Sequence, residues 1–196
     1  MRRIVAAEYL SLDGVTEDPG PTEDFDRAGD DFEHAGWTLP YWNDELSELQ
    51  SELLFASEAL LLGRVTYEEF VASWPKRSGD PYTEKINSMP KFVASTTLRE
   101  PLEWNATLLE GNTVEAVKQL KEQPGKDLLI YGSAELVNTL MRHGVIDSFR
   151  LMLYPLVLPG GKRLFREPGD STTFTLANTK TTSTGVVVLT YERSEG

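Results

Sequence analysis

The sequence predicts an α/β fold with a mixed, mostly parallel sheet of about eight strands, flanked by helices and ending in antiparallel strands. Three observations support this prediction. Short apolar strands alternate with amphipathic helices between residues 3 and 144. Two strands, at 59–62 and 127–131, each run through a glycine directly into a helix. The last two strands, about 172–181 and 186–193, alternate in polarity around a Thr184-Gly185 turn, which is typical of a hairpin.

Composition restricts the domain count and the class of function. A chain of 196 residues that is 40% hydrophobic fits a single domain spanning 1–196. Its 31 acidic and 19 basic residues give a net charge of −12, which argues against nonspecific binding to nucleic acid or to an anionic membrane. The chain has no cysteine and only two histidines, so disulfides and thiolate ligands are excluded and no metal site is expected. We expect neither a signal peptide nor a membrane-spanning stretch, since the N-terminal apolar run is short and is broken by Glu8, and we therefore expect a cytoplasmic protein.

The first strand is predicted at residues 3–10 and carries a carboxylate within an apolar run. Glu8 is costly there unless it is paired, so either it lies at an edge or rim facing water or it has a function. Asp13 follows in a Ser-Leu-Asp-Gly turn. It is either ordinary turn chemistry or a carboxylate at the rim of a cleft.

Residues 15–42 show no periodicity and end in three aromatic residues, Trp37, Tyr41 and Trp42. A loop of this length in a compact domain is usually functional, and its aromatic residues favour a packed lid. They either line a pocket for a planar substrate or hold the loop on the core, and we favour the pocket wall. A helix capped by Asn43 is then predicted to about residue 56, and Asp44 suits the dipole of its first turn.

The stretch 59–74 is the most informative of the chain, because an apolar strand meets a helix at Gly63 and Arg64. Thr66 stands three residues before Glu69, a capping-box spacing that predicts the helix start at Thr66. Unpaired N–H groups at a helix N-terminus suit a phosphate, and an arginine adds a charged, planar fork. The alternative is a turn that binds nothing, with Arg64 paired to a carboxylate.

The second strand–glycine–helix unit, at 127–141, has Gly132 and Ser133 at its junction and Gly144 at the helix end. Two such units in one sheet can hold the two phosphates of a dinucleotide, although the classical G-x-G-x-x-G pattern is absent. Between the units we expect a polar connector at 75–90, strands at 91–94 and about 107–109, and a helix at about 112–122. The hydroxyls of Ser95 and Thr96 either donate to a phosphate or cap the next turn. An alternating strand is predicted over 147–158.

These residues give the chain a resemblance to the dihydrofolate reductase-like family. It is most similar to the branch that includes the C-terminal reductase domain of the bifunctional riboflavin-biosynthesis enzyme. The similarity lies in four stretches that together span almost the whole chain: Ser11-Leu12-Asp13-Gly14; Leu62-Gly63-Arg64-Val65-Thr66-Tyr67-Glu68, which resembles a G-R-x-T-[WY]-E motif; Ile130-Tyr131-Gly132-Ser133-Ala134; and Gly144-Val145-Ile146-Asp147 through to Pro159-Gly160-Gly161.

The resemblance implies an NADPH-dependent reductase on a dihydrofolate reductase-like mixed sheet. By this resemblance, Arg64 meets the 2′-phosphate of the cofactor and Thr66 its pyrophosphate, while Ser95 and Thr96 flank the adenosine. The remaining predicted cofactor-binding positions are Gly63 at the first junction and Tyr131, Gly132, Ser133 and Ala134 at the second. The resemblance implies that Gly132, Ser133 and Ala134 give backbone N–H groups to the other phosphate.

The proton donor is where the chain departs from the family pattern. Trp37-Thr38-Leu39-Pro40 resembles the segment that precedes the acid of dihydrofolate reductases, but Trp42 stands at the position of that acid. Asp13, Glu8 and Asp44 are therefore the candidate catalytic residues, and Trp37 and Trp42 the candidate substrate-binding residues. Lys162 and Arg163 either meet a substrate phosphate or form a solvated basic pair.

The leading hypothesis is a reductase that transfers a hydride from NADPH to a planar C=N or C=O substrate held under the 15–42 loop. The alternative is a catalytically silent nucleotide-binding module, such as a sensor or a sequestering protein, and a third is a purely structural interaction domain. The expected partner is a small molecule. The resemblance also implies a homodimer, because domains of the riboflavin branch pair through their sheets, and strand 147–158 is the candidate interface.

Overall fold

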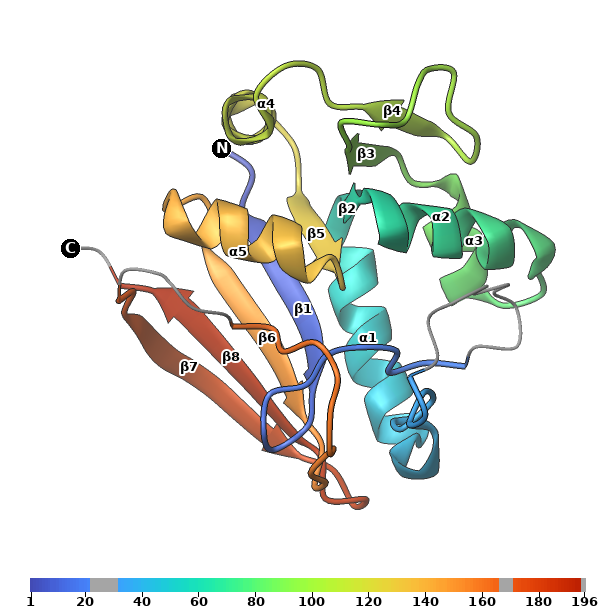
Figure 1. Ribbon diagram of the computed structural model, residues 1–196, viewed down its shortest axis with the longest axis vertical. Coiled ribbons are helices and arrows are strands. Elements are labelled where there is room, and N and C mark those ends of the chain that lie inside the picture. Colours follow the sequence, from blue (N-terminus) through green and yellow to red (C-terminus); the bar gives the residue numbers. More distant parts are fainter. Residues whose placement is uncertain (22–31, 166–170, 195–196) are drawn as a thin grey trace.

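Eight strands form one sheet in the computed structural model, which describes residues 1–21, 32–165 and 171–194. The strand order across the sheet is β4-β3-β2-β5-β1-β6-β8-β7 (Figure 1). In chain order the strands are β1 (Ile4–Leu10), β2 (Ser57–Gly63), β3 (Lys91–Ala94), β4 (Ala106–Leu108), β5 (Asp127–Tyr131), β6 (Ser148–Leu153), β7 (Phe174–Thr181) and β8 (Val187–Arg193).

The sheet is parallel from β4 to β6 and antiparallel from β6 to β7. The prediction of a mixed sheet with antiparallel strands at its end is therefore confirmed. Since β1, β2, β3 and β5 are parallel, their carboxyl ends lie at one edge of the sheet. This arrangement brings the two strand–glycine–helix junctions to the same edge.

Helices cover both faces of the sheet. The helices are α1 (Asp44–Ala56), α2 (Arg64–Ser73), α3 (Pro81–Ser88), α4 (Thr113–Glu122) and α5 (Ala134–Arg142), with short 3-10 turns η1 (Leu39–Tyr41) and η2 (Trp74–Lys76). Apolar residues of α1, α2 and α3 pack in one core cluster, and those of α4 and α5 pack in a second cluster on the opposite face. No helix in the described ranges is long and apolar enough to cross a membrane.

The predicted polar connector at 75–90 is wrong, because it contains α3. The carboxylate of Asp80 caps this helix by accepting hydrogen bonds from the backbone N–H and the hydroxyl of Thr83, at 2.9 and 2.6 Å. Pro81 occupies the first helical position, where the missing N–H costs nothing. Pro81 therefore begins a helix within the predicted connector.

The predicted strand at 147–158 is wrong beyond Leu153, where β6 ends. Pro155 has no N–H to donate, and the N–H of Leu156 turns back to the carbonyl of Tyr154 at 2.8 Å. Both edges of β6 are already paired, with β1 and with β8. This strand therefore offers no free edge to a second copy, and the homodimer itself stays a prediction.

The described parts of the 15–42 loop pack against the rest of the domain. Val15 forms an isolated antiparallel bridge with Arg163, and the hydroxyl of Thr38 donates to the carbonyl of Pro19 at 2.5 Å. The middle of the predicted lid, 22–31, lies outside the described residues. The flanks of the loop are thus held near the carboxyl end of β1.

Candidate nucleotide and substrate site

The two strand–glycine–helix junctions are joined to each other through Ser133. The hydroxyl of Ser133 accepts a hydrogen bond from the backbone N–H of Gly63 at 2.8 Å. The backbone N–H of Ser133 donates to the hydroxyl of Thr66 at 3.1 Å. These contacts bring together the predicted residues of both units at one edge of the sheet.

The junction of the second unit depends on an unusual backbone conformation. Gly132 and Ser133 have φ of +57° and +61°, in the left-handed region that favours glycine. A Cβ added at Gly132 would stand 3.3 Å from the hydroxyl oxygen of Thr66. Gly132 is therefore required for both its backbone conformation and the close approach of α2.

The residues that precede α2 and α5, Gly63 and Ser133, make no side-chain hydrogen bond that caps the helix within the part of the chain that the structure describes. The predicted capping box is wrong: α2 begins at Arg64 after Gly63, and the hydroxyl of Thr66 accepts from Ser133 in the neighbouring unit. Uncapped first-turn N–H groups and the positive ends of two helix dipoles favour an anion at this edge. The donor set therefore fits the phosphates of a dinucleotide.

Arg64, at the first position of α2, is about half exposed and forms an ion pair with Glu68 at 2.7 Å. An exposed pair of this kind contributes at most about 1 kcal/mol to stability. A ligand that binds the guanidinium of Arg64 therefore loses little free energy by breaking this ion pair.

Ser95 and Thr96 follow β3, the strand next to β2, and so lie at the same edge of the sheet. The hydroxyl oxygen of Ser95 accepts from the backbone N–H groups of Thr97 and Leu98 at 3.1 and 3.0 Å. Ser95 therefore caps its own turn. Thr96 is exposed.

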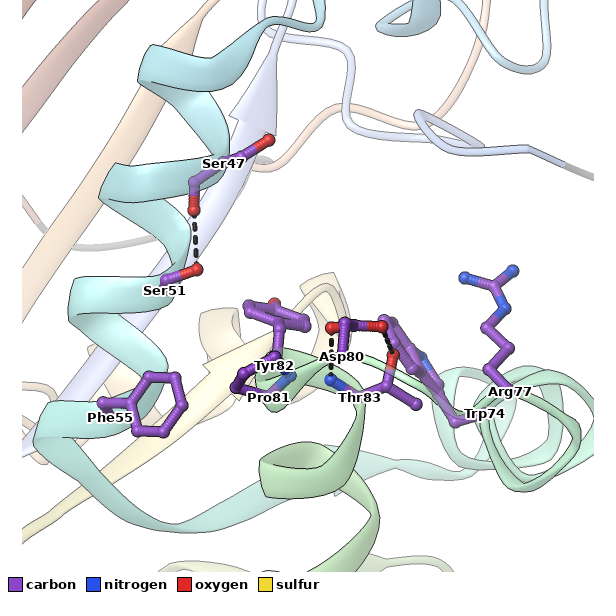
Figure 2. Close-up of a pocket in the computed structure, with 9 residues that line it drawn as sticks. All are labelled: Ser47, Ser51, Phe55, Trp74, Arg77, Asp80, Pro81, Tyr82 and Thr83. Carbon is purple, nitrogen blue, oxygen red and sulfur yellow. Dashed lines mark hydrogen bonds between the residues drawn. The ribbon is translucent and has the colours of Figure 1, made fainter.

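An open pocket of about 650 Å³ lies between α1 and the segment formed by η2 and α3 (Figure 2). This volume falls within the roughly 300–1,000 Å³ common for small-molecule sites. Ser47, Ser51 and Phe55 line it from α1, and Trp74, Arg77 and Tyr82 line it from the opposite wall. The guanidinium of Arg77 lies over the ring of Trp74, 4.8 Å from its centroid, and supplies a positive charge at this wall. The pocket thus combines aromatic surface with a cation and with the carboxylate of Asp80, which also lines it.

The pocket is connected to the end of β5 by two tyrosines. The hydroxyl of Tyr82 donates to that of Tyr131 at 3.2 Å, and Tyr131 directly precedes Gly132 in the phosphate-type junction. The side chain of Tyr131 therefore lies on the face of the sheet that carries the pocket. Only the backbone of Tyr131 remains for its predicted role in cofactor binding.

Comparison with known proteins decides the family. The model of the RibD C-terminal domain matches residues 2–188. This chain belongs to the RibD C-terminal domain family. Two relatives in Bacillus subtilis (strain 168) are both described as uncharacterized. YyaP is 33% identical over 97% of this chain and 94% of its own length. YwjB is 30% identical over 63% of this chain and 67% of its own length.

Solved structures share the fold of this RibD C-terminal domain. A Shewanella sp. PV-4 protein named for riboflavin biosynthesis has a TM-score of 0.69 at 20% identity, covering 98% of this chain and 99% of that one. A pyrimidine reductase-like protein of Corynebacterium diphtheriae has a TM-score of 0.64 at 12% identity, and the match covers 100% of this chain and 93% of that one. Dihydrofolate reductase of Enterococcus faecalis, solved with NADP(H) and RAB-propyl, has a TM-score of 0.63 at 15% identity, and the match covers 98% of this chain and 97% of that one. The predicted dihydrofolate reductase-like fold is confirmed.

Asp13 ties two loops of this RibD C-terminal domain together. Its carboxylate accepts from the hydroxyl of Ser11 at 2.7 Å, from the N–H of Leu158 at 3.1 Å and from the guanidinium of Arg163 at 3.2 Å. The Ser11 bond above all lowers the pKa of Asp13 below its usual range. Asp13 is thereby held as a carboxylate, which does not suit a proton donor. Lys162 pairs with Glu17, so the basic pair holds the same loops.

Glu8 lies in the middle of the sheet, because β1 is flanked by β5 and β6. The edge or rim interpretation is therefore wrong: the side chain is only 1% exposed. It shares a face with Ala6 and Leu10, which pack in the α4–α5 cluster, away from the pocket. Its Oε2 accepts from the hydroxyl of Thr16 at 3.4 Å, and Oε1 has no hydrogen-bond partner among the described residues. Burial raises the pKa of Glu8 well above 4.5.

Substituting Glu8→Gln is expected to stabilise the protein at pH 7. The folded state binds more protons than the unfolded state above pH 4.5, so the stability of the wild type falls as the pH rises through that value, and glutamine removes this fall. Since 1 kcal/mol shifts the Tm of a domain of this size by roughly 2–4 °C, thermal melts from pH 4 to 7 resolve the effect. A difference in Tm that does not grow with pH would contradict the buried, proton-binding carboxyl, and exposed Glu48→Gln is the control.

The third acid and the two tryptophans occupy different environments. Asp44 is exposed in the first turn of α1. Trp37 is buried, donates from Nε1 to the carbonyl of Glu17 at 2.7 Å and packs edge-on against Tyr154, so it holds the loop on the core. Trp42 is 43% exposed and donates to the hydroxyl of Ser47, a pocket residue, at 2.9 Å. Trp42 therefore adjoins the pocket, and Trp37 does not line it.

Sequence reasoning missed the far wall of the pocket and the residue beneath it. Arg77 and Tyr82 fell within the supposed connector. Gln50 interrupts the apolar stripe of α1 and is buried at 3% exposure. A polar residue on a buried helix face was the available indication that a hydrogen-bond network lies there.

Proposed function

We propose that this chain is an NADPH-dependent reductase acting on a planar C=N or C=O substrate. The observation behind the proposal is the pair of uncapped helix N-termini, α2 and α5, joined through Ser133 and flanked by Arg64. The fold shared with a dihydrofolate reductase that binds NADP(H) supports it. Membership in the RibD C-terminal domain family supports a reductase in general.

The cofactor would be held by the residues at this edge. Arg64 would meet the 2′-phosphate, and the hydroxyl of Thr66 with the first N–H groups of α2 would meet one phosphate. The backbone of Gly132 and Ala134, at the start of α5, would meet the other, while Ser133, whose N–H donates to Thr66, would hold the two junctions together. Ser95 and Thr96 would lie beside the adenosine. When bound, NADPH supplies the hydride, and the protein supplies binding, orientation and exclusion of water.

The substrate would occupy the pocket between α1 and α3. Its aromatic wall at Trp74 and Tyr82 suits a planar ring, and Arg77 suits an acidic substituent. A pterin-like or riboflavin-pathway-like pyrimidine has both properties. Trp42, next to Ser47, would border this site at the end nearest to β1.

The second candidate is a nucleotide-binding module without turnover, and one observation favours it. None of the three predicted acids faces the pocket as a free acid: Asp13 is ion-paired, Glu8 faces the opposite side of the sheet, and Asp44 is solvated at a helix start. A sensor or sequestering protein needs no proton donor.

A screen of NADPH oxidation over pterins, ribosylated pyrimidines and small carbonyl compounds distinguishes the two candidates. The reductase proposal expects the loss of absorbance of NADPH with at least one class, dependent on the protein. Tight NADPH binding without oxidation by any class would favour the binding module. Absence of nucleotide binding would contradict both and leave a structural interaction domain.

A further inference from the structure

A chain of hydrogen bonds runs beneath the pocket from α3 to β1. The hydroxyl of Tyr82 donates to the hydroxyl of Tyr131, which donates to Oε1 of Gln50, both at 3.2 Å. The amide Nε2 of Gln50 donates to the hydroxyl of Tyr9 at 2.6 Å. Four residues on four different elements thus share one polar network, and the two in its middle, Gln50 and Tyr131, are more than nine-tenths buried.

The direction of this chain is fixed by a sulfur atom. The Nε2 of Gln50 also lies 3.1 Å from Sδ of Met152, which is 2% exposed. A thioether accepts hydrogen bonds and cannot donate them, so the amide must turn its NH₂ group toward Met152. Oε1 then faces Tyr131 and requires a donor from it. The proton of Tyr131 is committed to Gln50, and the proton of Tyr82 is committed to Tyr131.

The direction of the chain determines what the pocket offers to a ligand. With its proton committed, Tyr82 presents an oxygen lone pair, which accepts a hydrogen bond. On the facing wall, the hydroxyl of Ser51 donates to the backbone carbonyl of Ser47 at 2.8 Å and likewise presents an acceptor (Figure 2). Burial raises the pKa of Tyr82 and of Tyr131, so both hydroxyls keep their protons at neutral pH.

We propose that the pocket selects planar ligands that bring an N–H or O–H donor to the hydroxyl oxygen of Tyr82, with Gln50 as the positioning residue that sets this preference. The inference rests on the proposed function only in taking this pocket as the substrate site. It specifies the substrate class further: a ring with a donor, such as a lactam N–H or an amino group, at its inner edge. A ring with only acceptors at that edge is disfavoured because two lone pairs would oppose each other.

Binding of two matched fragments tests the inference without any nicotinamide nucleotide. Indole and benzofuran have the same shape and differ in an N–H donor against an oxygen acceptor. Titration is followed by NMR through the ring N–H resonance of Trp74, which lines the pocket. The wild type is expected to bind indole about three- to tenfold more tightly than benzofuran, the ratio that one neutral hydrogen bond gives.

Variants separate the effect of the hydrogen-bond direction from an effect of side-chain packing alone. Tyr82→Phe is expected to remove the preference for indole, and Tyr131→Phe or Gln50→Met to reduce it, because the proton of Tyr82 is then free to turn toward the pocket. Gln50→Glu keeps an acceptor for Tyr131 and is expected to keep the preference, whereas a purely structural role would make both Gln50 variants alike. Tyr191→Phe, outside this pocket, is the control.

Three results would overturn the inference: equal binding of both fragments by the wild type, an indole preference that survives Tyr82→Phe, or no response of Trp74 to either fragment. None of these involves NADPH. If the protein binds NADPH but shows no fragment preference, the proposed function stands and this inference fails. If it prefers indole but does not bind NADPH, this inference stands and the proposed function fails.

Discussion

Gly132→Val is expected to weaken NADPH binding by about a hundredfold or more, equivalent to about 2.8 kcal/mol. Valine is strained at φ +57°, and its Cβ would stand 3.3 Å from the Thr66 hydroxyl that holds Ser133. Relief of this contact pushes the α2 and α5 N-termini apart, so the two groups of N–H donors can no longer face one ligand. Isothermal titration of the purified variant with NADPH measures the loss.

Gly111→Val is the matched control for backbone strain alone. Gly111 also has a left-handed φ, +69°, but a Cβ there meets no atom within 4 Å, and it follows β4, which β3 separates from β2 and its junction. This variant is expected to lose stability and keep its affinity for NADPH. Should Gly132→Val fold and bind NADPH as tightly as the Gly111 variant, the junction would not be the phosphate site.

Arg64→Ala is expected to weaken NADPH binding by about 10- to 100-fold and to leave NADH binding nearly unchanged. The two nucleotides differ only in the 2′-phosphate, and hydrogen bonds to a charged group contribute about 1.5–3 kcal/mol. Arg64 begins α2 at the carboxyl edge, with its guanidinium about half exposed. Parallel fluorescence titrations with both nucleotides give the ratio.

Glu68→Gln provides the companion variant, because Glu68 holds Arg64 in an ion pair at 2.7 Å. Removing the carboxylate that competes for Arg64 is expected to leave NADPH binding equal or tighter, because the guanidinium no longer has to leave this ion pair. The substitution leaves the apolar residues of α2 unchanged. An equal loss of NADPH and NADH affinity in Arg64→Ala would count against contact with the 2′-phosphate and assign Arg64 to the helix alone.

The parts of the fold that were predictable from the sequence are those set by local pattern. The apolar run before Gly63, the helical spacing after it and its repetition around Gly132 predicted two strand–glycine–helix units in one sheet, and β2 and β5 are neighbours in that sheet. The hairpin at Thr184-Gly185 was equally local, with Gly185 at φ +85°.

The parts that were missed depend on partners distant in sequence. Thr66 has the spacing of a capping residue, but Ser133, 67 residues away, uses its hydroxyl instead. The direction of the Gln50 amide depends on Met152, 102 residues away. Glu8 could not be assigned to a face of the sheet until the position of β1 between β5 and β6 was known. Such contacts have no local sequence pattern.

Titration of the wild-type protein with NADPH and with NADH, followed by quenching of tryptophan fluorescence, tests the central claim most directly. The account predicts that NADPH binds at least about tenfold more tightly, a difference of roughly 1.4 kcal/mol. Failure to bind either nucleotide would contradict it, because the joined N-termini of α2 and α5 would then be turns of the fold and no phosphate site.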